Sequence, residues 1–433
     1  MAWSNANDRL LKERARRVIP NGMYGHESTA RLPEVYPQFF RRSEGAYLWD
    51  TDNNKYIDFM CAFGPNLFGY RHKEIERAAA AQRERGDSMT GPSEIMVDLA
   101  ETLVDLVTHA QWCIFGKNGT DATTLAATIA RAHTKRRKIL VATGSYHGAA
   151  PWCTPSPNGV TAEDKANLIG HDYNNVESLV AAARVASHDL AAILVTPFRH
   201  EVFREQFLAD ARYAVTAREI CDVSGALLIV DDVRAGFRIA RDCSWATLGV
   251  QPDLSCWGKC LANGYPLSAV LGNDLTRDAA GCVFTTGSFW FQAVPMAAAI
   301  RTLQLIRDTN YLENLVSAGT LLREGLDKQA TRYGFELSQT GPVQMPQILF
   351  ADDPDFRLGY AWASECLQRG VYFHPYHNMF LSTAHTEAVI TEALCISEEA
   401  FAALRQRRAH LASPAQLAGL PLPPRTRSSN RAA

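Results

Sequence analysis

Short apolar runs alternate with longer amphipathic stretches through the middle of the chain. The apolar runs predict strands at residues 138–143, 191–197, 226–232, 254–258 and 268–272. The stretches between them have helical periodicity, at residues 121–134, 176–187 and 210–223. Strands that alternate with helices predict a mostly parallel sheet covered on both faces. The predicted fold class is therefore α/β, with a large central sheet covered by helices.

The two ends of the chain show other patterns. Residues 1–20 predict a helix that ends at Pro20-Asn21-Gly22, and a hairpin follows, with strands at 46–50 and 55–59 around a polar turn. After about residue 305, longer helices dominate. The elements predicted there are a helix at 358–369, a strand at 370–374 and a helix at 386–408.

These patterns predict a division into domains. Residues 61–304 form a large domain, and residues 305–412 form a smaller α+β domain that the N-terminal segment, residues 1–60, joins in space. Residues 413–433 are rich in Pro, Arg and Ser and predict a disordered tail.

Composition narrows the class of protein. The chain has 433 residues, of which 47% are hydrophobic and 21% charged, as expected for a globular enzyme with a large core. A net charge of −2 gives no basic field for nucleic acid. The ten cysteines form no Cys-x-x-Cys pair, so no metal site is predicted. Neither an apolar signal core nor a membrane-length apolar run occurs, and we expect a cytoplasmic protein with free thiols.

Lys259 follows a short apolar strand, and Asp231 ends another apolar strand 28 positions earlier. Pyridoxal phosphate (PLP) enzymes use this arrangement: the lysine carries the cofactor as a Schiff base and the acid pairs with the pyridine nitrogen. The alternative for Asp231 is a helix N-cap. Lys117 competes with Lys259, but it lies in a turn where its charge has another use. We therefore assign the Schiff base to Lys259.

The turn Asn118-Gly119-Thr120 precedes a helix rich in Ala and Thr. Gly119 permits close approach of a ligand to the backbone, and free N–H groups at a helix start favour phosphate. A simple N-cap is the alternative interpretation of this motif, and the more frequent one when the motif stands alone.

Tyr146-His147 follows the strand at 138–143, at the strand end where cofactors bind in such sheets. Tyr146 is suited to stacking on a planar ring, and Val233 to packing on the opposite face of that ring. His147 has two interpretations of equal weight, catalytic and structural.

Taken together, the chain resembles the class III, fold-type I aminotransferases, in the branch of glutamate-1-semialdehyde aminomutase. The likeness extends from about Arg16 to Arg405. The motifs that carry it include Gly45-Ala46-Tyr47-Leu48-Trp49-Asp50, Asn118-Gly119-Thr120-Asp121-Ala122, Tyr146-His147-Gly148, Asp231-Asp232-Val233-Arg234-Ala235-Gly236-Phe237-Arg238, Gly258-Lys259 and Ser382-Thr383-Ala384-His385-Thr386.

The resemblance implies PLP as cofactor and a homodimer whose active sites lie at the subunit interface. It implies that Lys259 is the aldimine lysine, Asp231 the partner of the pyridine nitrogen and Tyr146 a stacking residue. Gly119 and Thr120 become phosphate contacts, with Asn118 where the family usually has Ser. A further phosphate contact is expected from the partner subunit, at Thr286 or Ser288.

Departures from the family pattern concern the substrate. The aminomutases hold the substrate carboxylate with an Arg after an early Gly-Gly turn, and residues 22–28 contain no Arg. Tyr24, His26 and Phe63 are expected to line a pocket of another shape. Arg199 and Arg234 are candidate contacts for anionic or polar substrate groups, with a structural role as the alternative.

The predicted function is a PLP-dependent aminotransferase that moves an amino group between a small amine donor and a keto or aldehyde acceptor. Three alternatives use the same scaffold: an intramolecular aminomutase, a racemase or decarboxylase, and a PLP-binding protein that has lost turnover.

Overall fold

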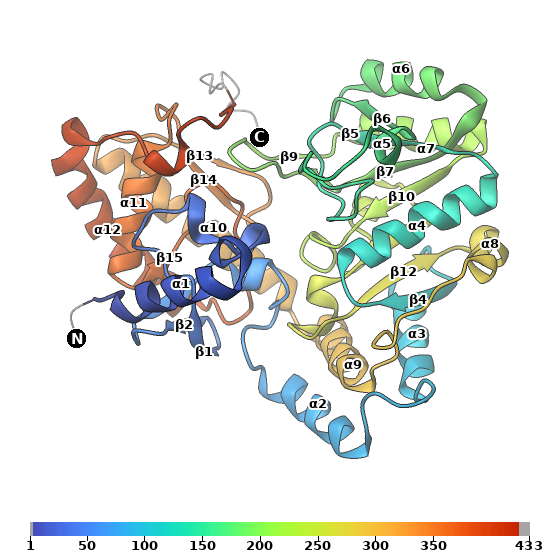
Figure 1. The fold of residues 1–433 in the computed structure, drawn as a ribbon, viewed down its shortest axis with the longest axis horizontal. Helices are drawn as coiled ribbons and strands as arrows, with labels where there is room; N and C mark the ends of the chain where they lie inside the picture. The colour runs from blue at the N-terminus through green and yellow to red at the C-terminus, as the bar shows by residue number, and fades with distance from the viewer. Residues whose placement is uncertain (1–2, 424–433) are drawn as a thin grey trace.

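A seven-stranded sheet forms the centre of the larger group of elements in this computed structural model, which describes residues 3–423 (Figure 1). Its spatial order is β4 (Trp112–Gly116), β12 (Ser268–Gly272), β11 (Leu254–Trp257), β10 (Leu227–Asp231), β7 (Leu190–Val195), β5 (Lys138–Ala142) and β6 (Leu168–His171). Strands β11 to β6 run parallel, and β12 is antiparallel to both its neighbours. The predicted mostly parallel sheet is confirmed, with β4 and β6 as additional strands.

Both faces of this sheet are buried, because apolar side chains alternate between two layers of helices. In β10, Leu227 and Ile229 pack in the core cluster that contains helix α4 (Gly119–Thr134). Leu228 and Val230 point the other way, into the larger cluster that contains α6 (Val176–Ala186) and α7 (Ala211–Ser224). The three helices predicted between the strands are therefore confirmed.

The remaining helices of this group surround the sheet and its loops. They are α2 (Lys73–Arg85), α3 (Ile95–Leu106), α5 (Ala162–Lys165), α8 (Arg277–Cys282) and α9 (Ala293–Asp308). Helix α9 contacts α2, α3 and the 3₁₀ turn Lys259–Ala262. This turn, which begins with the candidate lysine, therefore packs against the long, largely buried helix α9.

The second group combines the two ends of the chain (Figure 1). Strands β1 (Phe40–Glu44), β2 (Tyr47–Asp50) and β3 (Lys55–Asp58) form an antiparallel sheet, and β15 (Val371–Tyr372) joins it beside β3. The hairpin β2–β3 is confirmed. The other elements of this group are α1 (Ala6–Val18), α10 (Tyr311–Arg332), β13 (Leu337–Thr340), β14 (Gln347–Phe350), α11 (Arg357–Gln368) and α12 (Glu387–Arg407).

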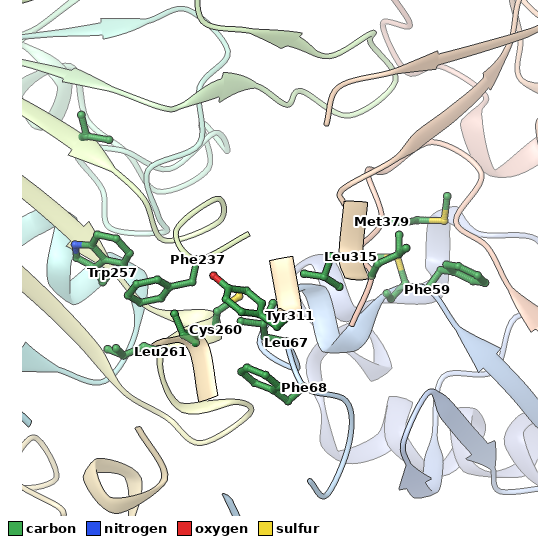
Figure 2. Packing of buried hydrophobic residues seen from close by; sticks show 14 of the residues in the cluster. Phe59, Leu67, Phe68, Phe237, Trp257, Cys260, Leu261, Tyr311, Leu315 and Met379 are labelled. Atoms are coloured by element: carbon green, nitrogen blue, oxygen red, sulfur yellow. The ribbon is translucent and has the colours of Figure 1, made fainter. Parts of the chain in front are cut away.

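One hydrophobic core joins the two groups (Figure 2). Phe237 packs on Trp257 with ring centroids 4.5 Å apart on the sheet side, and Tyr311 lies next to Cys260. The same cluster continues to Phe59 among the N-terminal elements. A continuous core of this kind fixes the position of one group relative to the other.

A small hairpin forms a second link between the groups. Its strands are β8 (Phe198–Arg199) and β9 (Phe207–Leu208), directly after the buried strand β7. At its tip, Phe203 stacks on Tyr376 at 4.1 Å, and the Phe203 N–H donates to the Tyr376 carbonyl oxygen at 3.1 Å. The hairpin is therefore anchored by its base in the large sheet and by its tip among the C-terminal elements.

The segment predicted to be a disordered tail is only partly described, since residues 424–433 lie outside the described residues. Within the described part of this segment, Leu417 is buried in a cluster with Phe203 and Phe356. None of the helices within residues 3–423 is long and apolar enough to cross a membrane.

Candidate active site

The loops that leave the carboxyl ends of β4, β5, β7, β10 and β11 meet at one edge of the sheet and line one cavity. The cavity is lined by His26, Asn118, Gly119, Thr120, Thr123, Tyr146, His147, Gly148, Thr196, Pro197, Phe198, His200, Asp231, Val233, Arg234 and Lys259. Residues predicted from five separate stretches of sequence are therefore together in space.

The turn Asn118–Thr120, the predicted phosphate-binding turn and called the phosphate turn below, lies at the start of helix α4. Asn118 is its N-cap: the Asn118 side chain accepts a hydrogen bond from the Asp121 N–H at 3.2 Å, and the Asp121 carboxylate accepts from the Asn118 N–H at 3.0 Å. The alternative interpretation of Asn118 as an N-cap is thus observed. It is compatible with a phosphate site, because Gly119 and Thr120, whose N–H groups have no partner within the helix, line the cavity.

Position 119 requires glycine because the side chain of Val233 lies very close to its backbone. A Cβ at this position would lie 2.7 Å from Cγ1 of Val233, which also lines the cavity. A Cβ at Gly258 would lie 3.4 Å from the same Val233 methyl group. Val233 therefore forms the floor of the cavity between the phosphate turn and the Lys259 loop.

Asp231 is buried and oriented by its neighbours. Its Oδ2 atom lies 2.8 Å from Nδ1 of His147, and its Oδ1 atom accepts from the Val233 N–H at 3.2 Å. Since a carboxylate only accepts, Nδ1 of His147 carries the proton of this bond. The other ring nitrogen, Nε2, is buried and has no partner among the described residues. These two hydrogen bonds fix the orientation of the carboxylate, which lines the cavity.

Lys259 reaches the cavity from a left-handed backbone position with φ of +43°. Burial, together with the nearby charge of Arg234, lowers the pKa of its ammonium group to about 8. The competitor Lys117 is not part of the lining, and its Nζ atom donates to the Pro266 carbonyl oxygen at 3.2 Å. The geometry therefore favours Lys259 over Lys117 as the reactive amine.

Two polar residues of the wall had no predicted role. Thr196 directly follows β7, and His200 lies on the β8–β9 hairpin. The Thr196 hydroxyl and the His200 Nε2 atom are both buried and without a partner in the described part of the chain. The position of Thr196 at a strand's carboxyl end is a signal that would have identified it. His200 has no such signal, because its place depends on the fold of the hairpin.

The structure does not bring every candidate into the lining. Tyr24 is 71% exposed, and Phe63 lies outside the lining and packs on His26, at 4.6 Å between ring centroids. Arg199 is paired with Glu201 at 2.6 Å and lies outside the lining. Thr286 and Ser288 also lie outside the lining formed by this protomer.

Comparison with known proteins shows the family. The model of the class-III aminotransferases matches residues 29–404. The chain belongs to the class-III aminotransferases. It is 62% identical over 394 residues, 91% of this chain and 93% of the relative, to the aminopentol aminotransferase of Sphingopyxis macrogoltabida. A glutamate-1-semialdehyde 2,1-aminomutase of Syntrophobacter fumaroxidans is 32% identical over 403 residues, 87% of this chain and 93% of that enzyme.

A solved structure agrees with this membership. The PLP internal aldimine form of the FumI protein of Sphingopyxis sp. MTA144 superposes with a TM-score of 0.93 at 61% identity, covering 94% of this chain and 98% of that one. This class-III aminotransferase uses PLP and transfers amino groups. Its own residues fit that cofactor: the cavity joins a helix start suited to phosphate, a buried acid and a buried amine, as the cofactor's chemistry requires.

Proposed function

We propose that the cavity residues divide the work of holding and using PLP. Lys259 would hold the cofactor through Nζ, and Asp231 would face its ring nitrogen. The turn Asn118–Thr120 would bind the phosphate, with Tyr146 and Val233 on the two ring faces. When bound, PLP supplies an electron sink for the carbon that bears the amine. The observation that carries this proposal is the convergence of these residues on one cavity.

Two residues act on protons in this proposal. After the donor amine releases Lys259, its Nζ atom accepts the proton from the nitrogen-bearing carbon and returns it. His147 donates to Asp231 at 2.8 Å and is a positioning residue that keeps the carboxylate aimed into the cavity. We expect Lys259→Ala to abolish turnover. A variant that retained wild-type turnover would overturn the assignment.

The proposed amino donor is a hydroxylated amine without a carboxylate, as the name of the 62% identical relative suggests for that enzyme. Two features of this chain support it. The early turn, residues 22–28, contains no Arg to hold a donor carboxylate. In the wall, the Thr196 hydroxyl and the His200 Nε2 atom are unpaired, as a substrate rich in hydroxyl groups would require.

A donor panel tests this proposal. The yellow holoenzyme is mixed separately with an aminopentol, with alanine and with glutamate 1-semialdehyde, and loss of the yellow absorbance is followed. Conversion with the aminopentol far faster than with alanine supports the proposal. Conversion of glutamate 1-semialdehyde to its isomer without a second substrate would instead support the aminomutase, a candidate kept because of the 32% identical relative.

We also propose a homodimer in which Thr286 or Ser288 of one protomer completes the phosphate site of the other. The loop that contains them exposes large apolar side chains: Phe284 is 89% exposed and Phe289 63%. Contiguous exposed aromatic residues are typical of an interface. Light scattering should give twice the chain mass. Phe289→Asp should weaken the dimer and the affinity for PLP together, whereas a fully active monomer would contradict the proposal.

The ten cysteines, all in the described part of the chain, are free thiols, which supports a reducing compartment such as the cytoplasm as the proposed location.

A further inference from the structure

Arg234 is a cation of the cavity without an anionic partner. Its Nη1 atom donates to the side-chain oxygen of Asn378, and no carboxylate of residues 3–423 lies within ion-pair distance of the guanidinium. The nearest acid of the cavity, Asp231, is already engaged by His147 and by the Val233 N–H. A guanidinium has five N–H donors in a planar fork, so most of its donors remain for a ligand.

Arg234 lies at the reactive end of the cavity. Its Cζ atom is 5.9 Å from the centre of the Phe380 ring. A Cβ built on Gly64 would lie 2.9 Å from that ring and 3.1 Å from Cδ of Lys259, so Phe380 and Lys259 flank the same point. The charge of Arg234 also lowers the pKa of Lys259. The phosphate turn lies on the other side, against Val233.

A structural role does not account for this arginine. Arg238, one turn further on, shows what such a role looks like: it is fully buried, and its two Nη atoms donate to the backbone oxygens of Leu381 and Gly64. Arg234 by contrast is only partly buried, lines the cavity and has a single amide partner that orients the guanidinium without neutralising it.

We propose that Arg234, held in place by Asn378, is the residue that binds the carboxylate of the amino acceptor. This inference rests on the proposed function, in which the donor has no carboxylate. The planar fork matches a carboxylate in two parallel hydrogen bonds, and the partly desolvated site strengthens them. Arg234 thereby determines acceptor specificity, while the donor is selected by other parts of the wall.

The test uses protein loaded directly with pyridoxamine phosphate, so that no donor is needed. Return of the yellow absorbance is followed in single turnovers with pyruvate and with its uncharged ester, methyl pyruvate. In Arg234→Gln, the half-saturating concentration of pyruvate should rise about ten- to a hundredfold, the loss expected for hydrogen bonds to a charged group. The half-saturating concentration of methyl pyruvate should stay within about threefold of the wild-type value. Arg234→Lys should give an intermediate value for pyruvate.

Two controls isolate the contact between Arg234 and the acceptor carboxylate. Any effect of the substitution on Lys259 acts on both acceptors alike and cancels in their ratio. Arg204→Gln removes an equal charge, but Arg204 is paired with Glu201 at 3.2 Å outside the lining, and this variant should match the wild type.

The possible outcomes separate the two proposals. Equal changes for pyruvate and methyl pyruvate, or wild-type pyruvate saturation in Arg234→Gln, would overturn the role of Arg234. Binding of unreactive propanoate, measured by calorimetry, should fall with pyruvate affinity and provides a readout without turnover. A wild type that restores no yellow absorbance with either acceptor would instead count against amino-group transfer itself.

Discussion

The basicity of Lys259 can be tested before any substrate is known. Its pKa is lowered from 10.5 to about 8, first by burial and second by Arg234. A shift of this size corresponds to about 3 kcal/mol of difference between the charged and neutral amine. At pH 7.5 about a quarter of the amine is then neutral, whereas an unshifted lysine would be neutral in only about one molecule per thousand. Because only the neutral amine is a nucleophile, the shift makes Lys259 reactive near neutral pH.

The assay mixes apoprotein with PLP in a stopped-flow instrument and follows the yellow absorbance from pH 6 to pH 10. Below its pKa the Lys259 amine is mostly protonated and does not react with PLP. The rate at which the protein binds PLP as a Schiff base, here the capture rate, should therefore rise with pH and level off above about pH 8. Arg234→Gln removes the second cause, so the midpoint should move to higher pH. The other titratable groups that act on the pKa of Lys259 are Asp231, Cys260 and Arg238.

Lys117 provides the matched control. Burial lowers its pKa to about 8 as well, but it lies outside the cavity. Lys117→Gln should therefore leave the profile unchanged. A wild-type capture rate that keeps rising through pH 9.5 would refute the reasoning, and so would a change of the profile in Lys117→Gln.

Three further predictions follow from packing and hydrogen bonding. Gly119→Ala should weaken PLP binding at least about tenfold in an apoprotein titration, because its Cβ meets a valine methyl at 2.7 Å, whereas Gly281→Ala, with open space around it, should not. Ser244→Ala should lower the free energy of unfolding, measured in urea at pH 8, by about 1–3 kcal/mol, since Asp232 loses a buried hydrogen bond. Burial raises the pKa of Asp232 to about 6, so its carboxylate is ionised above this pH. The loss of free energy should therefore be smaller at pH 5. Phe203→Ala should lower the free energy of unfolding by about 3 kcal/mol or more, because the tip of the β8–β9 hairpin loses its stacking on Tyr376. It should also raise KM for the amino donor, and an unchanged KM would contradict this.

The central sheet was predictable because its strands carry apolar runs on both faces. The runs in β5, β7, β10, β11 and β12 are mostly apolar and bounded by polar turns, which makes them recognisable in the sequence. Strand β4 was missed because Trp112–Gly116 merges with the following phosphate turn. Strand β6, Leu168–His171, has only a short apolar stretch at the sheet edge and so carries little periodic signal.

For the candidate site, residues at strand ends could be placed near one another from the sequence alone. Asp231 ends β10 and Lys259 lies just after β11, and these two strands are neighbours in the sheet. Residues that depend on a tertiary contact could not be placed in this way. His200 enters the cavity through the hairpin, and Asn378 reaches Arg234 from the C-terminal elements 144 positions away. No local pattern encodes such distances.

The β8–β9 hairpin has a consequence for how this enzyme can change. It carries His200 and Phe198 into the cavity wall, yet its tip is held by Phe203 and Tyr376, away from the cofactor residues. We expect substitutions at that anchor to move the wall that carries His200 and to leave Asn118–Thr120, Asp231 and Lys259 in place. Under this expectation, changes at apolar positions remote from the cavity would alter which amines are accepted without altering the residues proposed to hold the cofactor.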